Sequence, residues 1–408
     1  MRKPELLAPA GNMEKLKYAL HYGADAVYLA GTSYGLRAKA GNFSIDEMYE
    51  AVKYVHDRDK KIYITMNIIP HNQDFEGMKD YVKILEALGV DGVIVADPGI
   101  IMLIKEIAPE LKISLSTQGN TTNYYSAKFW HQMGINRIVL ARELSIQEIK
   151  TIIDNTPDTL EIETFIHGAM CISYSGRCLL SNYMANRDAN KGDCAQPCRW
   201  NYSLMEKTRE NEYFPVYEDE RGTYVFNSKD LCLIENIPEL IKVGVNSFKI
   251  EGRMKSVFYV ATVVRAYRKS IDEYLKCPQK YVFNTSNLDE LKKVSHREYT
   301  SGFALNKPTQ EDQNYTSSTY VREYDFVGIV LDYNVETQIA TIEQRNKIEI
   351  NDTIEIMRPN EDFIEQKVLQ MWNEEDQLLE STPHPKMIFR MKMNSKVEPM
   401  DLLRKALK

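Results

Sequence analysis

Residues 61–97 have the sequence KIYITMNIIPHNQDFEGMKDYVKILEALGVDGVIVAD, which contains one complete strand–helix–strand unit. The run at 61–67, rich in β-branched and aromatic residues, is typical of a strand, and so is the apolar run at 91–96. Between them, residues 75–88 carry apolar side chains at three- and four-residue spacing, which indicates an amphipathic helix that Gly89 ends. A helix that joins two strands in this way predicts parallel strands with a right-handed crossover.

The same unit recurs along most of the chain. Candidate strands lie at 5–10, 26–30, 61–67, 91–96, 112–117, 137–141, 161–166 and 247–251. Candidate helices lie between them at 13–22, 45–57, 75–88, 100–107, 124–133 and 146–154, with a last one at 254–274. Ser44 and Ser145 are candidate N-caps, each with Glu three residues later. Eight such units, without a GxGxxG or GxxxxGK[ST] loop, favour a closed TIM-like (β/α)8 barrel of the α/β class over an open sheet. We predict this catalytic barrel domain at residues 1–283.

The pattern changes after the barrel. Residues 284–318 are polar and predict a linker. From 319 to 408, β-branched runs alternate with turns, at 326–333, 338–343, 352–357 and 365–372. Short strands without intervening helices predict a small antiparallel β-barrel domain.

The composition restricts the class of protein. The chain has 408 residues, of which 43% are hydrophobic, and this suffices for a large core. It shows neither a signal-peptide pattern nor the ~20 consecutive apolar residues that span a bilayer, so we expect a cytoplasmic protein with no membrane segment. The net charge of −7 argues against broad coating of nucleic acid, although it allows a local basic site.

The connection at 168–233 is long for a compact domain, and loops of this length are usually functional. It carries five of the six cysteines, in the pattern Cys171-x6-Cys178-x15-Cys194-x3-Cys198 followed by Cys232. Disulfides are rare in the cytoplasm, so clustered thiols favour a metal over cross-links or free catalytic thiols. The wide, turn-rich spacing suits an iron–sulfur cluster on four thiolates better than zinc, which usually takes tight CxxC pairs.

In such a barrel the chemistry lies at the carboxyl ends of the strands. Polar residues follow the predicted strands there, namely Asn67, Asp97, Gln118, Arg142, His167 and Glu251. His167 is a candidate general acid or base, a candidate hydrogen-bond donor to a thiolate, or a core histidine. Glu163 precedes it on the same strand, and an ion pair with Lys249 or Arg253 is the alternative to a catalytic role. Tyr174 is a candidate to stack on a base or to pack over the cluster.

The cysteine segment resembles one known family. The stretch at 163–181, ETFIHGAMCISYSGRCLLS, is similar to the signature of the collagenase-like U-type peptidase family thirty-two, whose mechanism is unknown. Further matching segments are LLAPAGN at 6–12, AGNF at 40–43, CAQPCRW at 194–200, NSKDLC at 227–232 and KIEGRMKS at 249–256. The resemblance covers nearly the whole chain.

This resemblance implies an RNA-modifying hydroxylase despite the peptidase name. Members of the family include a tRNA hydroxylase that makes 5-hydroxyuridine at the wobble position with prephenate, an rRNA cytidine hydroxylase and an oxygen-independent ubiquinone hydroxylation pair. Several of them carry a 4Fe–4S cluster. The chain looks most like the tRNA branch, which implies tRNA as substrate and prephenate as co-substrate. Because relatives occur in pairs, a paralogous partner subunit is also implied.

The resemblance also implies roles for individual residues. The expected cluster ligands are Cys171, Cys178, Cys194 and Cys232, with Cys198 as an alternative fourth ligand and zinc as the alternative metal. Prephenate is a dicarboxylate, so Arg37, Arg142 and Arg253 are candidate clamps, each with an ion pair to a barrel carboxylate as the alternative. The other candidates for substrate binding are Asn67, Gln118, Lys229 and Lys249, and those for catalysis are His167, Glu163 and Tyr174.

Two other functions stay open on sequence grounds. A peptidase needs a nucleophile or a catalytic metal, and no HExxH occurs. The segment Gly31-Thr-Ser33-Tyr-Gly35 fits GxSxG but precedes further glycines in place of a helix, and Cys171 with His167 is a thiol-protease candidate. The second alternative is a zinc-stabilised RNA-binding module without catalysis.

Overall fold

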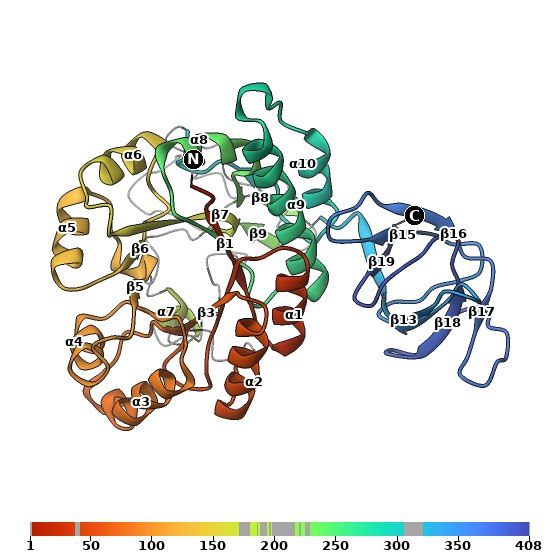
Figure 1. Ribbon diagram of the computed structural model, residues 1–408, viewed down its shortest axis with the longest axis horizontal. Coiled ribbons are helices and arrows are strands. Elements are labelled where there is room, and N and C mark those ends of the chain that lie inside the picture. The colour runs from red at the N-terminus through yellow and green to blue at the C-terminus, as the bar shows by residue number, and fades with distance from the viewer. Residues whose placement is uncertain are drawn as a thin grey trace.

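The computed structural model describes residues 2–36, 41–170, 229–305 and 321–407, together with 180–185, 187, 194, 195, 197, 217–219 and 222–224. These residues form a barrel surrounded by helices and a smaller β domain, which lies beside α1, α9 and α10 in Figure 1. The barrel unit extends to residue 305, and the β domain begins at residue 321.

Eight parallel strands close into the barrel. They are β1 (Glu5–Pro9), β2 (Ala26–Leu29), β3 (Lys61–Met66), β4 (Gly92–Val95), β5 (Ile113–Leu115), β6 (Arg137–Val139), β7 (Glu161–Ala169) and β11 (Ser247–Ile250). Each strand from β1 to β7 pairs with the next, and β11 pairs with both β7 and β1, which closes the cylinder. The predicted (β/α)8 class is confirmed. All eight predicted strands are present, although β7 runs to Ala169 and therefore includes His167.

Helices cover the outside of the barrel (Figure 1). They are α1 (Met13–His21), α2 (Ile45–His56), α3 (Met78–Leu88), α4 (Pro98–Ile107), α5 (Tyr124–Gln132), α6 (Ile146–Asp154), α8 (Ile237–Val243) and α9 (Val257–Lys276), with α7 (Leu180–Ala185) in the long connection. Ser44 and Ser145 form the predicted capping boxes, each with the Glu three residues later. No helix in the described part of the chain is long and apolar enough to cross a membrane.

Two short strands extend the barrel wall beyond β7. The strand β10 (Asp230–Cys232) pairs antiparallel with the end of β7, so that Cys232 lies opposite His167. The strand β12 (Tyr299–Thr300) pairs with β10 in turn. Within the long connection, β8 (Tyr217–Asp219) and β9 (Gly222–Tyr224) pair as a hairpin.

The linker predicted at 284–318 is wrong up to residue 305. Helix α10 (Thr285–Lys292) packs on α9 and leads to β12. The segment looked like a linker because α10 buries polar side chains: Asn287 and Glu290 are 2% and 6% exposed. Nδ2 of Asn287 donates to Glu273 on α9 at 3.2 Å, so its burial is compensated by a hydrogen bond. Residues 306–318 lie outside the described residues.

The second domain is a single curled antiparallel sheet. Its strands are β13 (Tyr324–Asn334), β14 (Ile339–Gln344), β15 (Thr353–Met357), β16 (Ile364–Lys367), β17 (Met371–Trp372), β18 (Ile388–Lys392) and β19 (Leu402–Ala406). They are ordered β16-β15-β19-β13-β14-β18-β17 around a core that includes Val330, Ile342 and Phe389. The predicted small antiparallel β domain is confirmed.

A buried charge cluster fixes this domain to the barrel. Arg404 on β19 has no exposed side-chain surface, and its guanidinium bonds both carboxylate oxygens of Glu290 on α10, at 2.7 and 3.0 Å. It also bonds Glu355 on β15 at 2.6 Å. The hydroxyl of Tyr22, next to α1, donates to the carbonyl of Met357 at 2.8 Å. Bidentate and buried contacts of this kind hold the two units in one orientation.

Candidate functional site

A layer of buried ion pairs fills the barrel below its mouth. The carboxylate of Glu163 on β7 lies 2.8 Å from Nζ of Lys249 and 3.1 Å from the guanidinium of Arg137. Burial alone raises the pKa of Glu163, but Lys249 and Arg137 outweigh it and hold this pKa below its usual value. Glu163 is therefore ionised and paired. The ion pair with Lys249, predicted as the alternative to a catalytic role, is present.

Above this layer, amides form a hydrogen-bonded network at the mouth. Nδ2 of Asn67, at the end of β3, donates to Oε1 of Gln118 at 2.6 Å. The hydroxyl of Ser116, at the end of β5, donates to the same oxygen at 3.1 Å. Oδ1 of Asn67 accepts from the backbone N–H of Leu36 at 3.3 Å. The structure thus brings together two of the predicted substrate-binding residues, Asn67 and Gln118.

Arg253 joins this network from the end of β11. Its guanidinium donates to Oγ1 of Thr65 at 3.4 Å and to the carbonyl of Leu36, the residue whose N–H holds Asn67. Arg253 is 4% exposed, so its charge acts in a medium of low polarity. Arg253 and Asn67 both bond the backbone of Leu36, so a cation lies beside the amide network. Such a combination of donors suits a ligand that is rich in oxygen acceptors.

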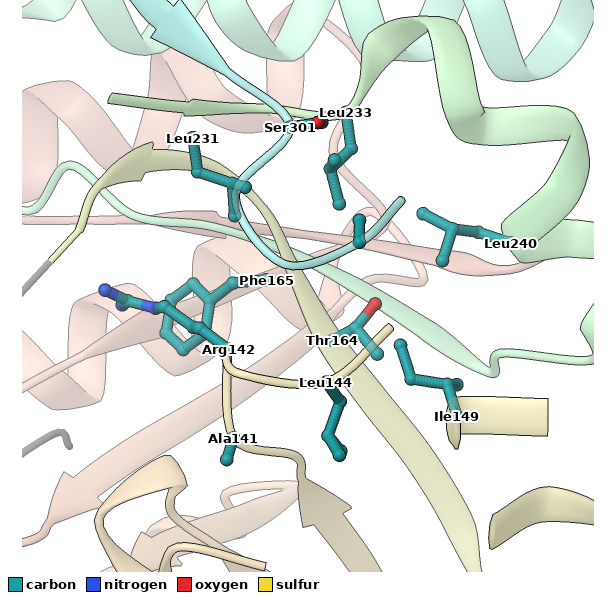
Figure 2. A pocket seen from close by; sticks show the side chains of 11 residues that line it. Ala141, Arg142, Leu144, Ile149, Thr164, Phe165, Leu231, Leu233, Leu240 and Ser301 are labelled. Atoms are coloured by element: carbon teal, nitrogen blue, oxygen red, sulfur yellow. The ribbon is translucent and has the colours of Figure 1, made fainter. Parts of the chain in front are cut away.

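Arg142 follows β6, the strand that pairs with β5. Its guanidinium donates to the carbonyl of Ala169 at 2.7 Å and lies 3.9 Å from the ring centroid of Phe165. Figure 2 shows Arg142 beside Phe165, with its guanidinium directed away from a small pocket lined mainly by apolar residues. The side chain is therefore held in one orientation by a hydrogen bond and a cation–π contact.

The small pocket of Figure 2 lies next to β7 and β10, with Thr164, Leu231 and Leu233 in its wall. Its other walls come from Ile149 on α6 and Leu240 on α8. The hydroxyl of Thr164 is buried and finds no hydrogen-bond partner in the described part of the chain. The lining is mostly apolar, so the pocket lacks the convergent polar groups of the mouth.

His167 lies on the helix side of β7, away from the mouth. Its Nδ1 lies 3.3 Å from the hydroxyl of Tyr267 on α9, and its ring also contacts Tyr259 and Tyr299. The side chain is 1% exposed, and burial lowers the pKa of His167 to about 3. The imidazole is therefore neutral at physiological pH, which argues against general-acid catalysis and leaves the hydrogen-bonding and core roles.

Cys232 shares the same buried hydroxyl. Its Sγ lies 3.7 Å from Oη of Tyr267, and burial raises the pKa of the Cys232 thiol to about 11. A metal that binds here must displace a proton, as metals ordinarily do at thiol ligands. The half-buried position beside a hydroxyl suits a cluster ligand, because hydrogen bonds to cluster sulfurs tune such centres.

The other predicted ligands are only partly visible. Cys194 is described and exposed, whereas Cys171, Cys178 and Cys198 lie outside the described residues. Within the described part of the chain, no three metal-binding side chains gather in one place. The predicted Arg37 and Tyr174 also lie outside the described residues. The iron–sulfur cluster therefore stays a prediction. Among its expected ligands, Cys232 is a thiol in a suitable position.

Three further predicted residues are Lys229, Glu251 and Asp97, of which Asp97 caps α4 by accepting from the backbone N–H groups of Gly99 and Ile100. Lys229 lies just before β10 and pairs with Glu298 at 3.2 Å, on the side of β12. Glu251 follows β11, and its carboxylate accepts from the hydroxyl of Tyr28 at 3.4 Å. Lys229 is thus separated from the amide network by the strand β7, whereas Glu251 lies at the mouth.

Sequence reasoning missed the hydroxyl of Tyr267, which ties β7, β10 and α9 together. This hydroxyl donates to the carbonyl of Ile166 at 2.7 Å and accepts from the N–H of Leu233 at 3.2 Å. A tyrosine in the middle of a mostly apolar helix was the available signal, because such a helix buries most of its side chains and a buried hydroxyl needs partners.

Replacing Tyr267 by phenylalanine is expected to lower the free energy of unfolding by about 1–3 kcal/mol, because it removes the buried hydroxyl that Nδ1 of His167 faces at 3.3 Å. The carbonyl of Ile166 and the N–H of Leu233 lose their bonds to this hydroxyl but keep the 2.9 Å hydrogen bond to each other. Urea denaturation followed by circular dichroism measures this. The control is Tyr125→Phe on α5, where the side chain is 71% exposed; its effect is expected to stay within about 0.5 kcal/mol. Equal effects at both positions would refute the assigned role of Tyr267.

Two models of known protein families match this chain, one on each of its two domains. The model of "Peptidase family U32" matches residues 11–314, and that of "Peptidase family U32 C-terminal domain" matches residues 322–404. The chain is 44% identical to tRNA hydroxylation protein P1 of Bacillus subtilis, over 99% of this chain and 95% of that protein. It is 39% identical to tRNA hydroxylation protein P of Escherichia coli, over 88% and 87%. It is also 37% identical to the 23S rRNA 5-hydroxycytidine C2501 synthase of Escherichia coli, over 67% of this chain and 40% of that protein.

Proposed function

We propose that this chain, which belongs to peptidase family U32, is an RNA hydroxylase that acts on tRNA, and that it hydroxylates C5 of the wobble uridine. The observation that carries the proposal is the similarity to tRNA hydroxylation protein P1 along almost the full length of both chains. The similarity to an rRNA 5-hydroxycytidine synthase supports the same type of reaction, a hydroxyl group placed on a pyrimidine.

The proposed chemistry needs an oxygen donor and a redox centre, because the replacement of a ring C–H by C–OH oxidises the base by two electrons. The proposed co-substrate is prephenate, and the proposed reaction runs without dioxygen. The proposed redox centre is a 4Fe–4S cluster on Cys171, Cys178, Cys194 and Cys232, with Cys198 as an alternative ligand. Such a cluster, when bound, supplies one-electron transfer.

The mouth of the barrel supplies the proposed binding groups. Arg253 and Arg142 offer positive charge for a dicarboxylate, and both guanidinium groups are oriented by backbone carbonyls, of Leu36 and Ala169. Asn67 and Gln118 offer neutral hydrogen-bonding groups between them. Lys249 and Glu163 form an ion pair below this site, so their charges neutralise each other.

The peptidase alternative loses its serine candidate. A nucleophile elbow places its serine on a sharp turn that leads directly into a helix. Ser33 is exposed in a bend after β2, and no helix follows it directly, since residues 34–36 are not helical and α2, the next helix among the described residues, begins at Ile45. The GxSxG match therefore lacks the geometry that gives this motif its chemistry.

The activity is tested with anaerobically purified protein, prephenate and tRNA from a strain that lacks wobble hydroxylation. We expect mass spectrometry of the digested tRNA to show 5-hydroxyuridine that depends on both the protein and prephenate. The same preparation is assayed on gelatin, where no cleavage is expected. Gelatin cleavage without any hydroxylated nucleoside would replace this proposal by the peptidase, and tRNA binding without either reaction would favour the zinc-stabilised binding module.

A further inference from the structure

The amide of Gln118 is held in one orientation by its neighbours. The chain of contacts begins at the backbone N–H of Leu36, which can only donate and which bonds Oδ1 of Asn67 at 3.3 Å. Asn67 must therefore turn its Nδ2 toward Gln118. Since Nδ2 is a donor, the atom of Gln118 that receives it at 2.6 Å must be the carbonyl oxygen Oε1.

The hydroxyl of Ser116 uses the same oxygen. It lies 3.1 Å from Oε1 and completes the two hydrogen bonds that a carbonyl oxygen readily accepts. The oxygen of Gln118 is thus saturated by the protein itself. Any further contact that Gln118 makes has to use its Nε2, which carries two N–H donors and no acceptor.

Nε2 of Gln118 is buried and has no hydrogen-bond partner among the residues that the structure describes. The whole side chain is only 6% exposed, at the end of β5. Buried donors are nearly always paired in native proteins, because an unpaired one costs folding free energy. The network that holds Gln118 also includes the cation Arg253, which donates to the carbonyl of Leu36. An unpaired donor at this place is expected if a ligand supplies the missing acceptor.

We infer that Gln118 is a substrate-binding residue that acts only as a hydrogen-bond donor, and that its amide N–H groups donate to an sp2 oxygen atom of the substrate complex. This inference rests on the proposed function and adds to it the polarity of one contact. Two sources of such an oxygen exist in the proposed reaction, a carboxylate of the co-substrate and a carbonyl of the pyrimidine base. Binding of the oxygen requires displacement of the atoms that now shield Nε2 from solvent.

The test is Gln118→Glu, which keeps the shape of the side chain and its acceptor toward Asn67 and Ser116 but replaces the N–H donors by an oxygen. The assay is run at pH 8, and the Michaelis constants for prephenate and for tRNA are measured separately. A rise of at least 30-fold for prephenate alone assigns the oxygen to the carboxylate. A rise of similar size for tRNA alone assigns it to the base carbonyl.

The matched control is Gln344→Glu in the β domain. Gln344 is also buried, but its Nε2 already donates to the carbonyl of Thr382 at 3.2 Å, so both Michaelis constants should stay at the wild-type values. If Gln118→Glu does not fold, as judged by circular dichroism, Gln118→Met takes its place, because it removes the donors without adding an acceptor.

A folded Gln118 variant with both Michaelis constants within twofold of the wild type overturns the inference and leaves the proposed function standing. Wild-type protein that forms no hydroxylated nucleoside overturns the proposed function, and the inference with it. The two failures are therefore distinguishable in one set of measurements.

Discussion

Replacing Glu163 by alanine should lower the free energy of unfolding by about 3–5 kcal/mol, the cost of leaving the buried ammonium of Lys249 without its carboxylate partner. Arg137 keeps its ion pairs to Glu5 and Glu161. The variant removes the carboxylate that Lys249 and Arg137 share inside the barrel. Lys249 is 4% exposed and so is Arg137, so water cannot replace the lost partner. Equilibrium unfolding in urea measures the effect, provided that the free energy of unfolding of the variant falls with urea concentration at the wild-type slope.

The matched control is Glu161→Ala on the same strand. Glu161 bonds the same guanidinium at 2.7 Å, but 30% of its side chain is exposed. Solvent screening limits the contribution of such a pair, and we expect a loss of about 1 kcal/mol or less. A loss of stability at Glu163 no larger than that at Glu161 would contradict the assignment of Glu163 as the buried carboxylate that Lys249 depends on.

The pH dependence of stability has the same origin. Because Lys249 and Arg137 hold the pKa of Glu163 below its unfolded value, the folded state binds fewer protons at this position than the unfolded state. The stabilisation is complete above the unfolded pKa and is lost as the pH falls through the folded pKa. Wild-type protein should therefore lose more stability than Glu163→Gln when the pH is lowered below about 4.5.

The barrel was predictable because its signals are local. Each β-α unit shows its own hydrophobic period, and the Ser44 and Ser145 capping boxes are complete within four residues of sequence. The count of eight units then selects the closed barrel, since each parallel pair needs a helical crossover. The amide pair Asn67 and Gln118 could be placed at the mouth for the same reason, from their positions at strand ends.

The position of His167 was not predictable, because it depends on a register shift between two strands distant in sequence. By simple alternation, Glu163, Phe165 and His167 would all face the barrel interior. Instead, Phe165 pairs with Lys249 while His167 pairs with Ile250, so one extra residue is inserted on β7. Such a bulge turns the following side chain to the other face, which puts His167 against the helix α9.

The second large effect concerns the cysteines. We expect Cys232→Ser to lose most of the iron of anaerobically purified protein, together with absorbance near ~400 nm, and to reduce tRNA hydroxylation by about 100-fold or more. A hydroxyl in place of the thiol removes one of four proposed ligands from a position held by β7, β10 and Tyr267. The fold itself should survive, because serine keeps the volume and the backbone pairing of β10.

The chain offers a matched control in Cys277→Ser. Cys277 is the sixth cysteine, exposed at the end of α9 and outside the proposed ligand set. The Cys277→Ser variant should keep its iron, colour and activity. The difference between Cys232→Ser and Cys277→Ser then separates the ligand role from any general effect of losing a thiol. Colourless wild-type protein with stoichiometric zinc would refute the iron–sulfur proposal. A Cys232→Ser variant that keeps its full iron content would exclude Cys232 as a ligand and favour Cys198 in its place.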